Sequence, residues 1–187
     1  IEVTNEGYAI AKIATIKMCE YISKTNNYNY FSLIPCNIYG PHDKFDEKKG
    51  HVIGSLIKKI FLAKNSNKKN VEIWGTGQVK RELIHVEDVS KAIIKFIFNR
   101  KPINKKIYWL NIGTDQDAKI NTIAKKIAKI VNYKGKLVNN IKKPDGVKSK
   151  LMNSSLSKKF GWHANINLDN GLNQTISWYI KNYQKTI

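Results

Sequence analysis

Residues 30–34, with the sequence YFSLI, run directly into Pro35 and are the stretch from which the fold can be read. A short, mostly apolar and aromatic run that is preceded by asparagines and followed by proline predicts a buried strand. Upstream, apolar residues spaced three and four positions apart over residues 8–24 predict a helix. The alternation of helix and strand is typical of an α/β fold.

The same alternation continues to the end of the chain, with residues 35–50 expected as a polar loop punctuated by Gly40, Pro41 and Gly50. Further helices are expected over 51–63, 86–98, 121–131 and 168–183, with a short one around Ser154. Further strands are expected over 71–74, 81–85 and 107–112, and near Leu137.

The charge of +19, from 33 basic and 14 acidic residues in 187, suggests a phosphate-bearing partner. Only Arg81 and Arg100 are arginines, however, and the lysines spread from Lys12 to Lys185. Proteins that bind nucleic acids often use arginine, whose guanidinium makes bidentate hydrogen bonds. We therefore attribute the positive charge to compositional bias rather than to nucleic-acid binding. A basic nucleic-acid-binding module remains the alternative from a different class.

Composition excludes several other classes of protein. With 42% hydrophobic and 25% charged residues, the chain is typical of a globular domain rather than a disordered or collagen-like one. No apolar run is long enough for a membrane-spanning helix. Two cysteines are too few for a disulfide framework or a cysteine-based metal site, so we expect a reduced, cytoplasmic setting and no metal.

Tyr8 and Lys12 form a Tyr-x-x-x-Lys pattern, which places both side chains on one face of the predicted helix. In this arrangement a lysine ammonium can hold a nucleotide ribose while the tyrosine passes a proton to a carbonyl oxygen. Among nine tyrosines and so many lysines, one or two such pairs are expected by chance, and this is the one present. Its meaning therefore depends on the motifs that follow.

Those motifs are PCNIYGP at 35–41, WGTG at 74–77, RELIHVED at 81–88 and NIGT at 111–114. In this order and spacing they resemble the extended short-chain dehydrogenase/reductase family, which acts on nucleotide sugars. The sequences PHDKF at 41–45, GHVI at 50–53 and KPDG at 143–146 are similar to the GDP-L-fucose synthase branch. That branch comprises the NADP-dependent epimerase-reductases of GDP-4-keto-6-deoxy-mannose.

The resemblance implies a catalytic set. Tyr8 would be the proton donor, and Lys12 would hold the nicotinamide ribose of NADP. The nicotinamide would lie against the segment formed by Pro35, Cys36, Asn37 and Ile38. His51 would be the acid/base group for inversion at C3 and C5, close to the cofactor. His42, His85 and His163 are interpreted as structural, and Cys36 is not taken as a nucleophile.

The resemblance also implies which residues contact the GDP-sugar, although several of them also have a purely structural interpretation. The implied residues are Asn37, Lys59, Trp74, Arg81, Asp145 and Lys150. Lys59 stands where the family usually has arginine, so charge is kept but bidentate geometry is lost. The alternatives are core packing for Trp74, a lone surface charge for Arg81, a turn residue for Asp145 and a helix-capping histidine for His51.

The family's glycine-rich phosphate loop has no counterpart in this sequence. Its catalytic serine and cysteine lie upstream of the tyrosine. We therefore expect the C-terminal portion of a longer enzyme, which by itself binds NADP weakly and turns nothing over. Another nucleotide-sugar epimerase or reductase, or an inactive relative, remains an alternative.

The resemblance further implies a Rossmann-type doubly wound parallel sheet interleaved with a smaller α/β domain. Segments 1–40 and 83–112 would belong to the nucleotide-binding domain, and segments 41–82 and 113–187 to the substrate-binding domain. A homodimer through the helix carrying Tyr8 is expected for the full-length protein.

Overall fold

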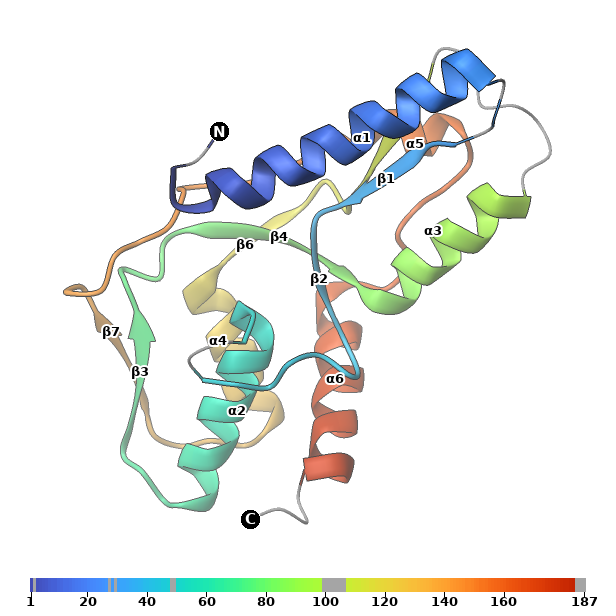
Figure 1. The fold of residues 1–187 in the computed structure, drawn as a ribbon. Coiled ribbons are helices and arrows are strands. Elements are labelled where there is room, and N and C mark those ends of the chain that lie inside the picture. Colours follow the sequence, from blue (N-terminus) through green and yellow to red (C-terminus); the bar gives the residue numbers. More distant parts are fainter. Residues whose placement is uncertain (2, 27, 29, 48–49, 99–106, 184–187) are drawn as a thin grey trace.

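A computed structural model describes residues 1, 3–26, 28, 30–47, 50–98 and 107–183 (Figure 1). After a 3₁₀ helix at Val3–Asn5, the helices are α1 Glu6–Asn26, α2 Val52–Asn65, α3 Val86–Phe98, α4 Ile120–Ile130, α5 Ser155–Lys159 and α6 Leu168–Tyr183. The strands are β1 Ser32–Pro35, β2 Asn37–Tyr39, β3 Asn70–Trp74, β4 Lys80–His85, β5 Trp109–Ile112, β6 Asp117–Lys119 and β7 Lys136–Asn140. The predicted α/β fold is confirmed.

Parallel pairing dominates the strands. Strand β1 pairs with β5, β2 with β4 and β3 with β7, all in parallel, while β6 lies antiparallel to β4. Strand β4 is therefore the middle strand of the order β2-β4-β6. Parallel strands need long crossovers, which here are largely helical.

The expectation of a polar loop over residues 35–50 is wrong at its start, where β2 forms. Pro35 and Asn37 are residue types typical of turns. The backbone of β2 nevertheless pairs with β4, from Asn37 opposite Leu83 to Tyr39 opposite His85. Strand β6 was not predicted either. It is three residues long and mostly polar, and it exists because it pairs with the first half of β4.

Two clusters of buried side chains organise the chain. The first, which we call the α2–α4–α6 core, includes Ile57, Ile73, Ile123 and Ile176. Figure 1 shows these three helices side by side, with β3 and β7 beyond them. An apolar stripe on each helix faces this core, as expected for helices that are polar on their other side.

The second cluster, the α3 core, includes Ile84, Phe96, Leu110 and Trp162. Trp162 reaches it from the C-terminal part of the chain, so residues far apart in sequence close the same core. The division into two domains at residues 40/41, 82/83 and 112/113 stays a prediction.

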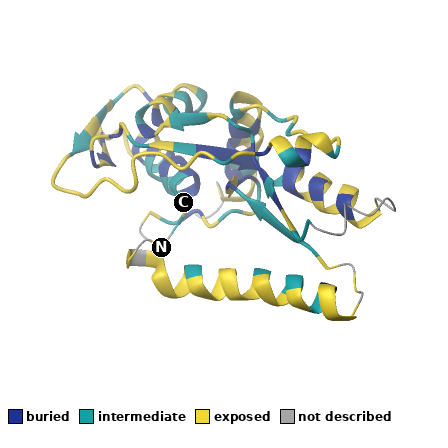
Figure 2. Cartoon of the chain, turned by 90° about the horizontal axis from the view of Figure 1, so that it is seen from above, coloured by how far each residue is buried: buried dark blue, intermediate teal, exposed yellow. Residues whose placement is uncertain are grey.

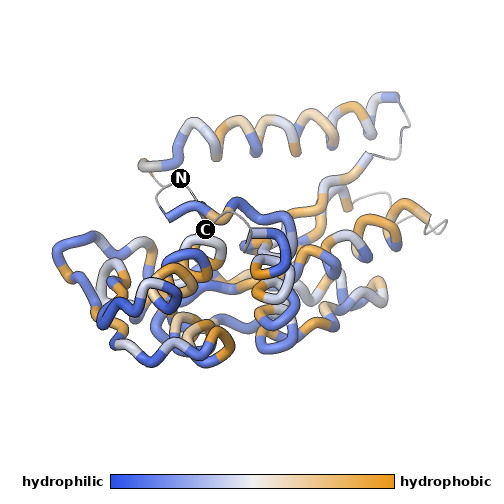
Figure 3. The backbone as a smooth tube through the Cα atoms, turned by 90° about the horizontal axis from the view of Figure 1, so that it is seen from below, coloured by the Kyte–Doolittle hydropathy of each residue, from blue (hydrophilic) through white to orange (hydrophobic). Residues whose placement is uncertain are grey.

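Helix α1 lies along one side of the molecule and is exposed over most of its surface (Figure 2). Ser23 is the one buried side chain described in it, and its hydroxyl donates to the carbonyl of Tyr30 at 2.8 Å. Apolar residues recur along its length (Figure 3), but none of those described is buried. No described helix has the length and apolarity required to cross a bilayer.

Glu82, on β4, is fully buried and accepts hydrogen bonds from three backbone N–H groups. Thr114 and Asp115 donate to its Oε1 at 2.7 and 2.8 Å, and Met152 donates to Oε2 at 2.7 Å. A Cβ at Gly113 would collide with Oε1, so glycine is required for the loop to approach the carboxylate. Three segments of the chain are thus joined at one side chain.

Removing this carboxylate leaves three backbone N–H groups without their acceptor. We expect Glu82→Ala to lower the free energy of unfolding by about 3 kcal/mol, since each unpaired buried donor costs about 1–3 kcal/mol. Urea unfolding measures the change. Glu87→Gln, an exposed change on the following helix, is the control and should stay within about 0.5 kcal/mol. A loss for Glu82→Ala no larger than that of the control would contradict this role.

His85, at the end of β4, is fully buried, and its ring packs edge-on against Tyr39 at 5.5 Å between centroids. Its Nδ1 accepts the N–H of Glu87 at 3.4 Å. Burial lowers the pKa of His85, against smaller opposing effects of Glu87 and Asp88. The folded chain therefore favours the neutral form of the imidazole.

This shift makes the stability of the chain sensitive to acid. As pH falls below about 6.5, the unfolded chain takes up the His85 proton before the folded chain does, so the free energy of unfolding falls. We expect His85→Gln to flatten this slope by up to about 1.4 kcal/mol per pH unit below about pH 6.5. Urea unfolding at several pH values tests it. A His85→Gln variant that keeps the wild-type slope would refute the assignment.

Candidate active site

Tyr8 and Lys12 lie one turn apart on α1. The Lys12 Nζ is 5.5 Å from the centroid of the Tyr8 ring, and Tyr8 is 68% exposed. The structure therefore brings the predicted pair together and presents the phenol to solvent rather than to a core.

The predicted nicotinamide segment forms the junction of β1 and β2. The N–H of Cys36 donates to Ile112 O at 3.0 Å, and the Asn37 side chain donates to Glu82 O at 2.9 Å. Pro35 ends β1 beside Ile112, at the carboxyl ends of two parallel strands, and Ile38 remains partly exposed. Ligands of open α/β sheets bind at this edge.

Burial raises the pKa of the Cys36 thiol to about 12, with a smaller contribution from the negative charge of Glu82. The thiolate is the reactive form of cysteine, so Cys36 stays neutral and unreactive at ordinary pH.

His51 occupies the position before α2 with 82% of its side chain exposed. Its ring makes no capping hydrogen bond to the helix, so the alternative interpretation as a helix-capping histidine is wrong. Its Nδ1 lies 3.5 Å from Oδ1 of Asp43, whose side chain is mostly buried. Asp43 was not singled out from the sequence, although it belongs to the PHDKF motif.

Three of the predicted substrate residues surround one cavity of about 280 Å³ between α2, β3 and the start of β4. Lys59 comes from α2, Trp74 ends β3 and Arg81 lies on β4. Gly50, next to His51, also lines this cavity, as do the acidic residues Glu47 and Glu72. We call it the Trp74 cavity.

Trp74 is 49% exposed, so the interpretation as a core residue is wrong. Two ammonium groups approach its ring, Lys59 Nζ at 5.2 Å and Lys143 Nζ at 5.4 Å from the centroid. Lys143 was not predicted, and the signal for it was the KPDG motif. Arg81 is not a lone surface charge, because its Nη1 donates to Lys80 O and to Val147 O, both at 2.7 Å.

Asn37, Asp145 and Lys150 do not line the Trp74 cavity. Asp145 nevertheless contacts the turn that follows Trp74, through hydrogen bonds from the backbone and hydroxyl of Thr76 at 2.9 and 2.7 Å. Lys150 is exposed beyond that loop.

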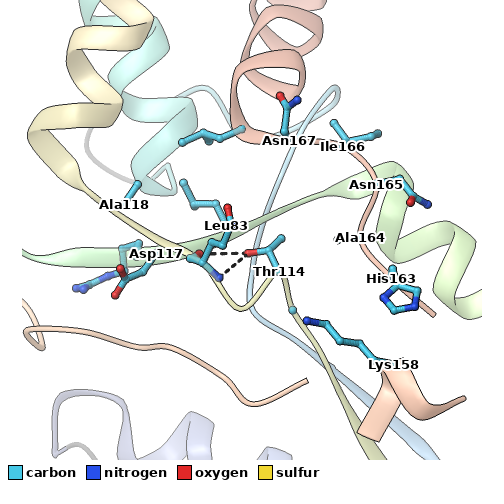
Figure 4. A pocket seen from close by; sticks show the side chains of 14 residues that line it. Leu83, Thr114, Asp117, Ala118, Lys158, His163, Ala164, Asn165, Ile166 and Asn167 are labelled. Carbon is cyan, nitrogen blue, oxygen red and sulfur yellow. Dashed lines mark hydrogen bonds between the residues drawn. The ribbon is translucent and has the colours of Figure 1, made fainter. Parts of the chain in front are cut away.

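A second cavity, of about 290 Å³, lies where α6 begins, between the segments 113–118 and 163–168 (Figure 4). His163 and Lys158 line it, and Lys158 is ion-paired with Asp115. Among the described residues, no group of three or more His, Cys, Asp or Glu side chains is placed to hold a metal ion.

The two cysteines should differ in reactivity. We expect iodoacetamide at pH 8 to modify the half-buried Cys19 in the folded chain and to leave Cys36 unmodified, because its thiol is buried and neutral. Peptide mass spectrometry measures the extent of modification, and unfolding in urea should make both sites react. Modification of Cys36 at the rate of Cys19 in the folded chain would show that the thiol is accessible.

Known proteins align with this chain over nearly its whole length. GDP-L-colitose synthase from Yersinia pseudotuberculosis is 42% identical over 183 residues, which are 96% of this chain and 58% of that protein. GDP-L-fucose synthase from Escherichia coli (strain K12) is 38% identical, covering 99% of this chain and 59% of that protein. The chain thus spans less than two thirds of the length of these relatives.

Solved structures agree with the sequence relatives. A GDP-6-OMe-4-keto-L-xylo-heptose reductase from Campylobacter jejuni superposes with a TM-score of 0.88 at 30% identity, over 97% of this chain and 62% of that one. A GDP-L-fucose synthetase from Naegleria fowleri bound to NADP shares the fold at a TM-score of 0.86 and 23% identity, over 98% of this chain and 58% of that one. The sequence model of one family matches residues 2–113, more than half of the chain. This chain therefore belongs to the NAD dependent epimerase/dehydratase family.

Proposed function

We propose that the chain is part of an NADP-dependent enzyme that epimerises GDP-4-keto-6-deoxy-mannose at C3 and C5 and reduces it at C4. The product would be GDP-L-fucose or a closely related GDP-deoxysugar. The observation that carries the proposal is the Trp74 cavity, on which Lys59, Trp74 and Arg81 converge and which Gly50 and Val52, the residues on either side of the exposed His51, also line. Relatives named as GDP-L-colitose and GDP-L-fucose synthases support the substrate class.

The described residues fit the nicotinamide end of NADP. Lys12 is exposed beside Tyr8, where its ammonium would hold the ribose, and the β1–β2 junction offers Ile38 at the carboxyl edge of parallel strands. When bound, the cofactor supplies hydride to C4. An N. fowleri relative of the same fold is described as bound to NADP, which supports this choice of cofactor.

Each residue then has a task that its position allows. The C4 ketone acidifies the protons at C3 and C5, and the His51 imidazole, exposed beside the cavity, removes and returns them. Tyr8 donates its phenolic proton to the C4 oxygen during reduction, with the Lys12 ammonium next to its ring. Lys59 and Arg81 bring positive charge to the diphosphate, and Trp74 offers an indole face beside them.

We further propose a homodimer in a reducing cytoplasm as the setting of the complete enzyme. Both cysteines are free thiols, which agrees with a reducing compartment. The nucleic-acid alternative does not account for the ordered motifs or for the family match, so it is not favoured.

A C4 reductase without epimerase activity is the second candidate, since the C. jejuni structure at 30% identity is described as a heptose reductase. In the complete enzyme, we expect His51→Gln to slow solvent-deuterium exchange at C3 and C5 by about 10²–10⁴-fold, the usual contribution of a general acid/base group. Ketone reduction, followed by NADPH absorbance, should be spared. Mass spectrometry of the sugar measures the exchange.

His163→Gln is the matched control, because His163 is exposed and lines the other cavity. Exchange that continues unchanged in His51→Gln would refute the epimerase and leave the reductase.

A further inference from the structure

The turn after β3 and the loop after β7 are fastened together by several hydrogen bonds. Strands β3 and β7 run in parallel with Trp74 opposite Asn140, and the N–H of Gly75 donates to Asn140 O at 3.0 Å. The Asn139 side chain donates to Gly75 O at 3.3 Å. The turn 75–77 is therefore already held by Asn139 and Asn140, in addition to its contact with the loop 143–146.

Asp145 completes the attachment with both carboxylate oxygens. Oδ1 accepts the N–H of Thr76 at 2.9 Å, and Oδ2 accepts its hydroxyl at 2.7 Å. Gly75 has φ +72°, and a Cβ there would collide with Oδ1 of Asp145. The turn and the carboxylate thus fit each other closely, and both oxygens are used within the chain.

Lys143 lies two residues before Asp145, and its backbone N–H donates to Asn140 O at 3.1 Å. Its side chain places a second ammonium against the Trp74 ring, which already has Lys59 at 5.2 Å. Both ammonium groups thus share one half-exposed indole, and a single ring attracts each of them only weakly. Lys59 finds one further acceptor, Glu72 O at 3.3 Å, while the Glu72 carboxylate accepts from Asn140. A ligand with two negative groups would offer each ammonium a stronger partner.

We propose that Lys143 binds the diphosphate of the nucleotide substrate together with Lys59, and that Asp145 is a positioning residue that holds Lys143 beside Trp74. The inference rests on the proposed GDP-sugar function. It gives Asp145 an indirect part, through the turn 75–77, in place of a direct contact with the substrate.

The neighbouring lysine provides a matched control. Lys142 carries the same charge, and its backbone is also held by Asn140, at 3.1 Å from N to Oδ1. Of these two neighbouring lysines, Lys143 is the one described with its ammonium over the Trp74 ring. Lys143→Gln and Lys142→Gln therefore lower the net charge equally, so a difference between them reports position rather than overall charge.

Calorimetric titration of the 187-residue chain with GDP tests the diphosphate contact. We expect Lys143→Gln to weaken GDP binding about tenfold and Lys142→Gln to change it less than twofold, as for the loss of one charge-assisted contact. Binding of GMP, which has one phosphate, should be weakened less than GDP binding by Lys143→Gln. Equal GDP affinity for the two variants refutes the inference and leaves the proposed function standing, whereas no GDP binding by the wild-type chain contradicts both.

Three further variants test the role of Asp145. Asp145→Ala should weaken GDP binding to the level of Lys143→Gln, and the double variant should be no weaker, because both changes remove one contact. Asp145→Asn should restore binding, since its amide can accept from the Thr76 N–H and donate to the Thr76 hydroxyl. Circular dichroism checks that each variant is folded. Additive losses, or an Asn variant as weak as the Ala variant, would refute a positioning role; the comparison of Lys143 with Lys142 does not depend on Asp145.

Discussion

The Glu82 carboxylate is the interaction on which the arrangement of the chain most depends. A buried charge is expensive unless it is fully hydrogen-bonded, and here three backbone N–H groups from two distant segments supply those bonds. The carbonyl of the same residue accepts from Asn37, which ties β2 to the same point. A single residue thus fixes the loop after β5, the segment before α5 and the predicted cofactor edge.

Strand β4 extends this constraint in two directions because neighbouring side chains point to opposite faces. Leu83 packs in the α2–α4–α6 core and Ile84 in the α3 core. Arg81, at the other end, reaches the Trp74 cavity and holds the carbonyl of Val147. One strand therefore sets both hydrophobic cores and one wall of the candidate substrate site.

The sequence allowed the larger elements to be predicted but not the short ones. Helices α2, α3, α4 and α6 have apolar periodicity over several turns, and their observed limits lie within about two residues of those expected. Strands β2 and β6 are three residues long, and their existence depends on β4 as a partner, which local sequence does not show. Local sequence likewise allowed Tyr8 and Lys12 to be paired, because both lie on one helix. The contacts of Asp43 and Lys143 became visible only in the tertiary structure. Their partners, His51 and Trp74, lie eight and sixty-nine positions away in the sequence.

The exposure of α1 has a consequence for how catalysis and recognition are distributed. An isolated helix gains most of its stability from packing, and α1 buries one described side chain along 21 residues. The Trp74 cavity, by contrast, is built on elements of the α2–α4–α6 core. The group that would donate the proton and the groups that would grip the nucleotide therefore belong to regions of unequal local stability. Within this chain taken alone, fraying of α1 would disrupt the Tyr8–Lys12 pair and leave the Trp74 cavity intact, so the two parts of the candidate site can be lost separately.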